Sequence, residues 1–297
     1  MKTILTMANY KSVIYVVLGA ISYGLLATIV KYANELGVHT STLTFLQFFI
    51  GFLILTVLQF TRRVNTKEKT TTTAKSRIKL TLWGSTLGLT TTLYYLSIQY
   101  IPVSVGIILL MQSIWISLVL EAIVNKQLPS KSKILGVITV LVGTVLATNL
   151  IQADIVLNPI GLLYGFGAGV SYAFSLYASS RIETQLPSIL RSRYLVLGGL
   201  LLICLFWNRQ IIDTFQVQAI PWGLLIALFG TVIAPIFFTM GIPKTGVALG
   251  NIIASLEIPV SITSAVLILH ESVEPIQWIG VSIILLAVII INLKTAK

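Results

Sequence analysis

The sequence has few charged residues and a single cysteine. Charged residues make up 10% of the 297 positions, whereas soluble domains usually contain about 25%. The one cysteine, Cys204, excludes a disulfide within the chain and a metal cluster held by cysteines. The sequence also lacks a Walker A motif, an HExxH pair and a GxSxG motif. We therefore predict that the protein is not an enzyme, and we predict no cofactor and no metal.

Long apolar runs fill most of the chain instead. Hydrophobic residues make up 56% of it, and the mean hydropathy is +0.95. The runs are continuously apolar, which favours membrane-spanning helices of roughly 20 residues over the alternating strands of a barrel. We predict an all-α integral membrane protein with ten transmembrane helices, at about 12–32, 40–60, 80–100, 102–124, 132–151, 157–178, 190–208, 219–240, 245–269 and 274–293.

The first run is long for the apolar core of a signal peptide, and no convincing cleavage site follows it, so it counts as a span. The net charge of +11 would suggest nucleic acid in a soluble protein, but the basic residues lie between apolar runs. With the N-terminus inside, every lysine and arginine except Lys31 and Arg209 faces the cytoplasm. We predict a multi-pass protein of the cell membrane, with both termini and the loop 61–79 cytoplasmic, in contact with the lipid bilayer and with no nucleic acid.

The two halves of the chain, 1–150 and 151–297, resemble each other. Gly106-Ile107-Ile108 corresponds to Gly250-Asn251-Ile252 at a spacing of 144, and Ser22-Tyr23 echoes Ser171-Tyr172. At the same spacing of 144, Ser117 matches Ser261. Five spans per half is an odd number, so the second half inserts upside down relative to the first. The sequence thus predicts two inverted five-helix repeats, an arrangement that recurs in secondary transporters with a substrate site near the midplane.

Glu257 is the one carboxylate near the middle of a predicted span. It shares a face of small and polar residues with Gly246, Gly250, Ala254, Ser261 and Ser264, and the related face of the first half holds Gly106, Ser113 and Ser117. Polar groups inside a bilayer usually face the interior of the bundle. We expect the two faces to line a central cavity in which Glu257 binds a substrate amine or a proton. The alternative is a structural glutamate bonded to a neighbouring helix.

Other candidates for the site are polar or aromatic residues within the predicted spans. They include Tyr94, Gln112, Trp115 and Tyr172. Aromatic rings can stack on a cation, although packing and interfacial roles are the alternative for these residues. The GxxxG steps at Gly84–Gly88 and through Gly161, Gly165 and Gly169 indicate close helix packing, either within a monomer or in a homodimer.

The most specific motifs resemble the EamA-type members of the drug/metabolite transporter superfamily. The resemblance rests on Ala254-Ser-Leu-Glu257-Ile-Pro259, on Leu269-His270-Glu271, and on Gln277-Trp278-Ile279-Gly280. It implies a ten-helix exporter fold with inverted repeats and alternating access. The sequence departs from residues common in the family at Gln127, Trp115 and Gln47. The resemblance therefore specifies the fold more closely than the substrate.

Together these features predict a secondary transporter that exports a small-molecule substrate, such as an amino acid or a related compound. A broad-specificity drug exporter is the alternative within transport. Outside transport, the alternatives are a membrane enzyme and a scaffold. An enzyme should cluster several titratable groups at one face of the membrane. A scaffold needs no polar helix face at the midplane of the bilayer.

Overall fold

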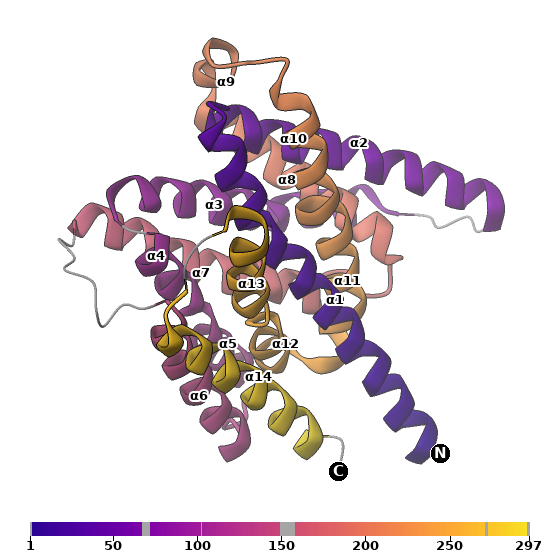
Figure 1. The fold of residues 1–297 in the computed structure, drawn as a ribbon. Coiled ribbons are helices and arrows are strands. Elements are labelled where there is room, and N and C mark those ends of the chain that lie inside the picture. Colours follow the sequence, from indigo (N-terminus) through magenta and orange to yellow (C-terminus); the bar gives the residue numbers. More distant parts are fainter. Residues whose placement is uncertain (1, 67–71, 102, 149–157, 271–272, 296–297) are drawn as a thin grey trace.

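The computed structural model describes residues 2–66, 72–101, 103–148, 158–270 and 273–295, and within these ranges the chain forms helices and turns with no strand (Figure 1). The first half contains α1 (Lys2–Glu35), α2 (Thr40–Thr66), α3 (Ala74–Tyr100), α4 (Val103–Met111), α5 (Ser113–Asn125) and α6 (Lys131–Ala147). The second half contains α7 (Pro159–Arg181), α8 (Ser188–Trp207), α9 (Arg209–Asp213), α10 (Ala219–Ile226), the π-helix η2 (Ala227–Ile233), α11 (Ala234–Thr245), α12 (Val247–Ala254), α13 (Glu257–Leu269) and α14 (Pro275–Thr295).

The all-helical prediction is confirmed for the described residues. Among them, seven helical stretches are long and apolar enough to cross a membrane: Tyr10–Glu35, Thr40–Thr61, Val105–Asn125, Pro159–Arg181, Ser188–Trp207, Ala219–Thr245 and Val247–Leu269. Each coincides with a predicted span. The other three predicted spans overlap α3, α6 and α14, which are more polar or shorter. The count of ten spans and their inverted arrangement stay predictions.

The helices extend further into the predicted loop 61–79 than the sequence suggested. The helix α2 continues to Thr66, and α3 begins at Ala74, where the Thr73 hydroxyl accepts a hydrogen bond from the Ser76 amide at 3.1 Å. Lys67, Lys69 and the predicted boundary between the halves at 150–151 lie outside the described residues. Polar and basic residues do not prevent a helix from running beyond the apolar core of a bilayer, so hydropathy alone misplaced these ends.

Two of the predicted spans are broken in the middle at corresponding positions. In the first half, α4 and α5 meet at Gln112, and in the second half α12 and α13 meet at 255–256. After the second break the Ile258 amide donates to the Ser255 carbonyl at 3.1 Å, because Pro259 has no N–H to offer that carbonyl. The continuous polar face predicted from Gly246 to Ser264 is therefore divided between two helices.

The structure shows further correspondences between the halves. The helices α5 and α13 both end in a left-handed residue, Lys126 with φ of 52° and His270 with φ of 55°, again 144 positions apart. The helix α1 packs on α11, α12 and α13, as α7 packs on α3, α4 and α5. Two further pairs, α2 with α8 and α6 with α14, each join corresponding helices. Several helix contacts thus recur when the two halves are exchanged, although the repeat itself stays a prediction.

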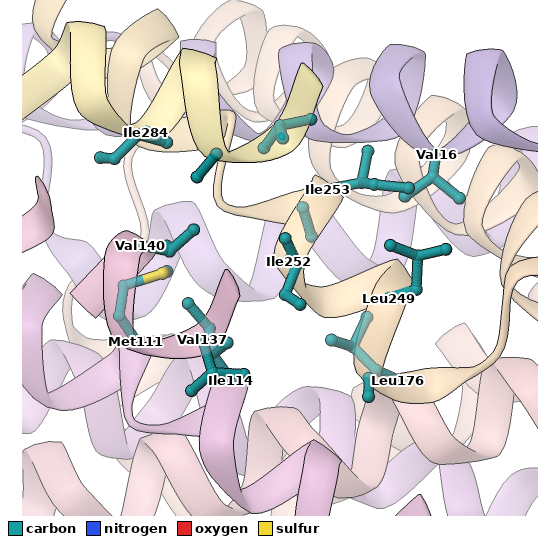
Figure 2. Packing of buried hydrophobic residues seen from close by; sticks show 14 of the residues in the cluster. Val16, Met111, Ile114, Val137, Val140, Leu176, Leu249, Ile252, Ile253 and Ile284 are labelled. Atoms are coloured by element: carbon teal, nitrogen blue, oxygen red, sulfur yellow. The ribbon is translucent and has the colours of Figure 1, made fainter. Parts of the chain in front are cut away.

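The short helix α12 lies at the centre of the largest apolar cluster. All eight of its residues are buried. Figure 2 shows Leu249, Ile252 and Ile253 of α12 among side chains from five neighbouring segments: Val16 of α1, Met111 and Ile114 at the first break, Val137 and Val140 of α6, Leu176 of α7 and Ile284 of α14. Apolar packing on every side holds α12 in place, and so positions the break that follows it.

Candidate functional site

The carboxyl group of Glu257 faces α7 at the break between α12 and α13. Glu257 is the first residue of α13 and is partly buried. The hydroxyl of Tyr172, a residue of α7 that is only 4% exposed, donates a hydrogen bond to Oε2 of Glu257 at 3.3 Å. The structure therefore brings together two residues that the sequence analysis selected 85 positions apart.

Two further tyrosines surround this pair. The rings of Tyr23 and Tyr172 meet edge to face with centroids 6.5 Å apart and an interplanar angle of 72°. Tyr23 and Tyr94 both lie close enough to Glu257 to interact with its charge. The sequence analysis selected Tyr94 and missed Tyr23. The signal was present, because Tyr23 occupies the position in the first half that Tyr172 occupies in the second.

A glycine allows α1 to approach the carboxylate. A Cβ atom on Gly24 would lie 2.6 Å from the Glu257 carbonyl oxygen and 2.6 Å from Cβ of Val260. No side chain larger than hydrogen fits there without a shift of one helix. The backbone of α1 thus packs directly against the first turn of α13 and fixes the distance between Tyr23 and the carboxylate.

A small cavity extends from the two tyrosines along α7. Its walls are formed by Tyr23, Gly84, Leu87, Tyr172, Ser175, Leu176, Ser179, Leu195, Pro235 and Phe238. It has room for about one water molecule. A cavity of this size does not admit a metabolite, so this space is closed in the structure.

One wall of the cavity is supported by a buried arginine. Arg191 of α8 is 1% exposed, and it donates hydrogen bonds to the carbonyl oxygens of Ser179 at 2.6 Å, Thr239 at 2.9 Å and Ile182 at 3.1 Å. The sequence analysis assigned Arg191 to a cytoplasmic loop, as a charge that sets orientation. The structure buries its guanidinium group, which joins the end of α7 to α8 and α11.

The predicted serines Ser113 and Ser117 lie elsewhere, between α5 and α12. Both are fully buried. The side-chain amide of Asn251 on α12 donates to the Ser117 hydroxyl at 2.8 Å. Ser117 and Asn251 thus form a direct contact between the two helices, and neither they nor Ser113 line the cavity beside Tyr172. Asn251 was not selected from the sequence as a site residue, although it stands where the first repeat has the apolar Ile107.

The remaining candidates do not contact the Glu257 carboxylate. The Trp115 indole donates to the Gln112 side-chain oxygen at 2.9 Å, and Trp115 is 37% exposed. Ser261 lies one turn after Glu257 on α13, where its carbonyl accepts a hydrogen bond from the Ser264 hydroxyl at 2.9 Å. The contacts at Glu257 thus join one carboxylate to the Tyr172 hydroxyl, with the Tyr23 ring packed on Tyr172. Such a group can bind a cation or donate hydrogen bonds to a polar ligand.

No set of three or more histidine, cysteine, aspartate or glutamate residues that could hold a metal ion occurs in the part of the chain that the structure describes.

Comparison with known proteins identifies the family of the chain. The model of the EamA-like transporter family matches the chain in two segments, residues 10–149 and 159–293. The uncharacterized transporter YwfM of Bacillus subtilis (strain 168) is 25% identical over 209 residues, which cover 69% of this chain and 70% of that protein. A crystal structure that is 15% identical has a TM-score of 0.78 and covers 99% of this chain and 98% of its own, which supports the fold. The chain belongs to the EamA-like transporter family and is a multi-pass membrane protein for the transport of small molecules.

Proposed function

We propose that the protein is a secondary transporter that exports a small metabolite with an amino group, such as an amino acid or a related compound, by alternating access. Glu257 binds the amino group. The observation that carries the proposal is the contact of the Glu257 carboxylate with the Tyr172 hydroxyl at a broken helix inside the bundle. Membership of the family supports a role in transport. The chemistry of this contact supports a substrate that carries an amino group.

The chemistry around Glu257 favours a cation of modest size. A carboxylate supplies a negative charge, and tyrosine rings attract cations through their faces. Tyr23, Tyr94 and Tyr172 all lie within electrostatic range of Glu257. A protonated amine can also donate hydrogen bonds to the carboxylate, which a quaternary ammonium ion cannot do. The same carboxylate can hold a proton when the amine is absent, since a carboxylate oxygen can take up a proton as well as accept a hydrogen bond from an amine.

Alternating access is supported by the correspondence between the halves. The breaks at Gln112 and at 255–256, and the left-handed caps at Lys126 and His270, recur at the same spacing. The family model also matches each half separately. Inverted repeats, which are related by a pseudo-twofold axis, allow a transporter to open a fixed site to each side of the membrane in turn. The nearly filled cavity beside Tyr172 fits a state in which the site is closed.

Transport by the purified protein in vesicles tests the proposal. Proteoliposomes are loaded with a mixture of amino acids and related amines, and efflux is followed by mass spectrometry with and without a pH gradient. We expect efflux of one or a few amines from the wild-type protein, and efflux reduced by about tenfold or more in Glu257→Gln, because a charge-assisted hydrogen bond contributes at least that factor.

Glu183→Gln is the matched control, because it removes a carboxylate far from the site. Glu183 forms an ion pair with Lys79 at 3.5 Å, and a hydrogen bond from Ser76 together with the charge of Lys79 lowers the pKa of Glu183. This variant should retain wild-type efflux. Equal efflux from Glu257→Gln and wild type would contradict the role of Glu257. Efflux of many unrelated hydrophobic cations would favour a drug exporter, and no flux of any compound would favour a scaffold or an enzyme.

A further inference from the structure

Glu121 joins three segments at one end of the α5–α12 contact. It lies in the last part of α5, and its Oε1 forms an ion pair with Nζ of Lys133 on α6 at 2.5 Å. Its Oε2 accepts a hydrogen bond from the backbone amide of Ala248 at 2.8 Å. Ala248 is the second residue of α12, so the carboxylate caps the N-terminus of that helix from another segment of the chain. The turn from Lys126 to Lys133 lies beside this contact.

A seam of buried polar side chains leads from Glu121 toward the two helix breaks. Because Glu121 meets Ala248 and Ser117 meets Asn251, the two helices run in opposite directions along the seam. One turn further along α5 lies Ser113, next to the break at Gln112, and Ser255 lies at the break after α12. Ser113, Ser117, Asn251 and Ser255 are each fully buried. Glu257 follows two residues after Ser255.

Two groups in this seam have no hydrogen-bond partner in the structure. They are the hydroxyl of Ser113 and the side-chain oxygen Oδ1 of Asn251. A buried polar atom without a partner costs free energy, and such an atom in a native protein calls for a physical reason. Apolar residues would pack this contact more favourably if it stayed closed at all times. Polar residues fit a contact that opens and admits water in another conformation.

We propose that the α5–α12 seam is the gate at the end of the bundle that carries Lys126 and Lys133, and that Glu121 is its latch. When the latch is closed, Glu121 holds Lys133 and the first turn of α12 together, and the seam is dry. Release of the Ala248 amide lets α12 move away from α5. Water then reaches Ser113 and Asn251, and a path opens to Glu257. This inference rests on the proposed alternating access, and it assigns that motion to particular residues.

Thiol labelling tests the gate without a substrate. The only native cysteine is replaced by Cys204→Ser, and Ser113→Cys serves as the probe, since the Ser113 hydroxyl makes no hydrogen bond that would be lost. A membrane-impermeant thiol reagent reacts quickly only with a thiolate in contact with water. Gln127→Cys, at an exposed position of the adjacent turn, identifies the accessible side in separate vesicles. The reagent is then applied from that side.

With the latch intact, we expect slow labelling of Ser113→Cys. Glu121→Gln should raise the rate by about tenfold, since it removes the ion pair and weakens the hydrogen bond to Ala248. Glu121→Ala should raise it further, because that variant also removes the acceptor. Lys133→Gln should give the smallest increase, since Glu121 can still cap α12. Hydrogen exchange of the amides in 247–250 should accelerate in the same order.

Glu183→Gln is again the control, because it breaks the ion pair with Lys79 near the start of α3, in a different part of the chain from α5 and α12. In this variant, the labelling rate of Ser113→Cys should equal the rate measured with the latch intact. A similar increase in Glu183→Gln would show general loosening and would overturn the proposal. Unchanged labelling in Glu121→Gln and Lys133→Gln would overturn it as well. If Glu121→Ala fails to fold, these two milder variants decide. Accessibility is measured without flux, so failure of the latch and failure of the transport proposal are distinguishable.

Discussion

Tyr23 and Tyr172 occupy corresponding positions in the two halves of the chain, and their rings meet edge to face with centroids 6.5 Å apart. Only Tyr172 donates to the Glu257 carboxylate. A residue that is repeated in the sequence thus has two different roles in the structure. One tyrosine holds the carboxylate, and the other packs against Phe238 at 5.4 Å between ring centroids. The two halves meet at this point, so the proposed binding residues lie close to their common interface.

Removal of the Tyr172 hydroxyl should weaken substrate binding while the packing is retained. Tyr172→Phe keeps the ring, and it deletes the donor to Glu257. We expect the KM for efflux to rise by about tenfold or more, because a hydrogen bond to a charged group contributes at least that factor. Tyr177→Phe on the same helix is the control, since its ring packs on Trp83 away from the carboxylate. An unchanged KM in Tyr172→Phe would show that the hydroxyl does not serve the site.

Close contact between α3 and α8 should make their glycines intolerant of any side chain. A Cβ atom on Gly84 would overlap the Leu195 carbonyl oxygen, and one on Gly198 would overlap that of Thr81. We expect Gly84→Ala and Gly198→Ala to lower thermal stability in detergent by about 1–3 kcal/mol or more.

Gly167→Ala provides the comparison for these two variants. Its added Cβ atom would meet only the end of the Leu93 side chain, at 3.3 Å. A mobile methyl group can move aside, and alanine favours a helix over glycine. The melting temperature of Gly167→Ala should therefore stay near that of the wild type. If all three variants melted alike, the packing of α3 on α8 would not be as close as the structure shows.

Loss of the Arg191 guanidinium group should destabilise the second half of the bundle. Arg191→Gln leaves several carbonyl oxygens at the junction of α7, α8 and α11 without a donor. Each buried acceptor without a partner costs about 1–3 kcal/mol, so we expect poor expression or a clearly lower melting temperature. Arg209→Gln, at an exposed position, should leave both unchanged. A normal melting temperature for Arg191→Gln would argue against a structural role for the buried cation.

The distribution of basic residues predicts that both termini lie in the cytoplasm. The beginning of α1 and the end of α14 lie toward the same lower end of Figure 1. Green fluorescent protein fused to either terminus should fluoresce, because it folds in the cytoplasm, and a periplasmic phosphatase fused there should be inactive. A phosphatase fusion at Arg209, in a predicted outside loop, should be active. Opposite results at the two termini would require an odd number of spans.

The apolar runs alone predicted most of the helices, since each long run must satisfy its backbone within a helix when it crosses a bilayer. The sequence also predicted a repeat, through Tyr23 with Tyr172 and through the spacing of 144 between other matched positions. Glu257 was recognisable because a carboxylate within an apolar run is costly and seldom occurs without a reason. These inferences depend only on the types of residues and their positions along the chain, both of which the sequence contains in full.

The contacts across helices were decided by the tertiary structure. No local pattern indicated that Glu121 would cap α12, that Asn251 would meet Ser117, or that Arg191 would be buried among carbonyl oxygens. Trp115 and Ser113 lie on one short helix, yet one is exposed and the other is fully buried. Hydropathy determines which segments enter the membrane. The direction that each side chain faces depends on which helices pack together, because that packing satisfies polar groups far apart in the chain.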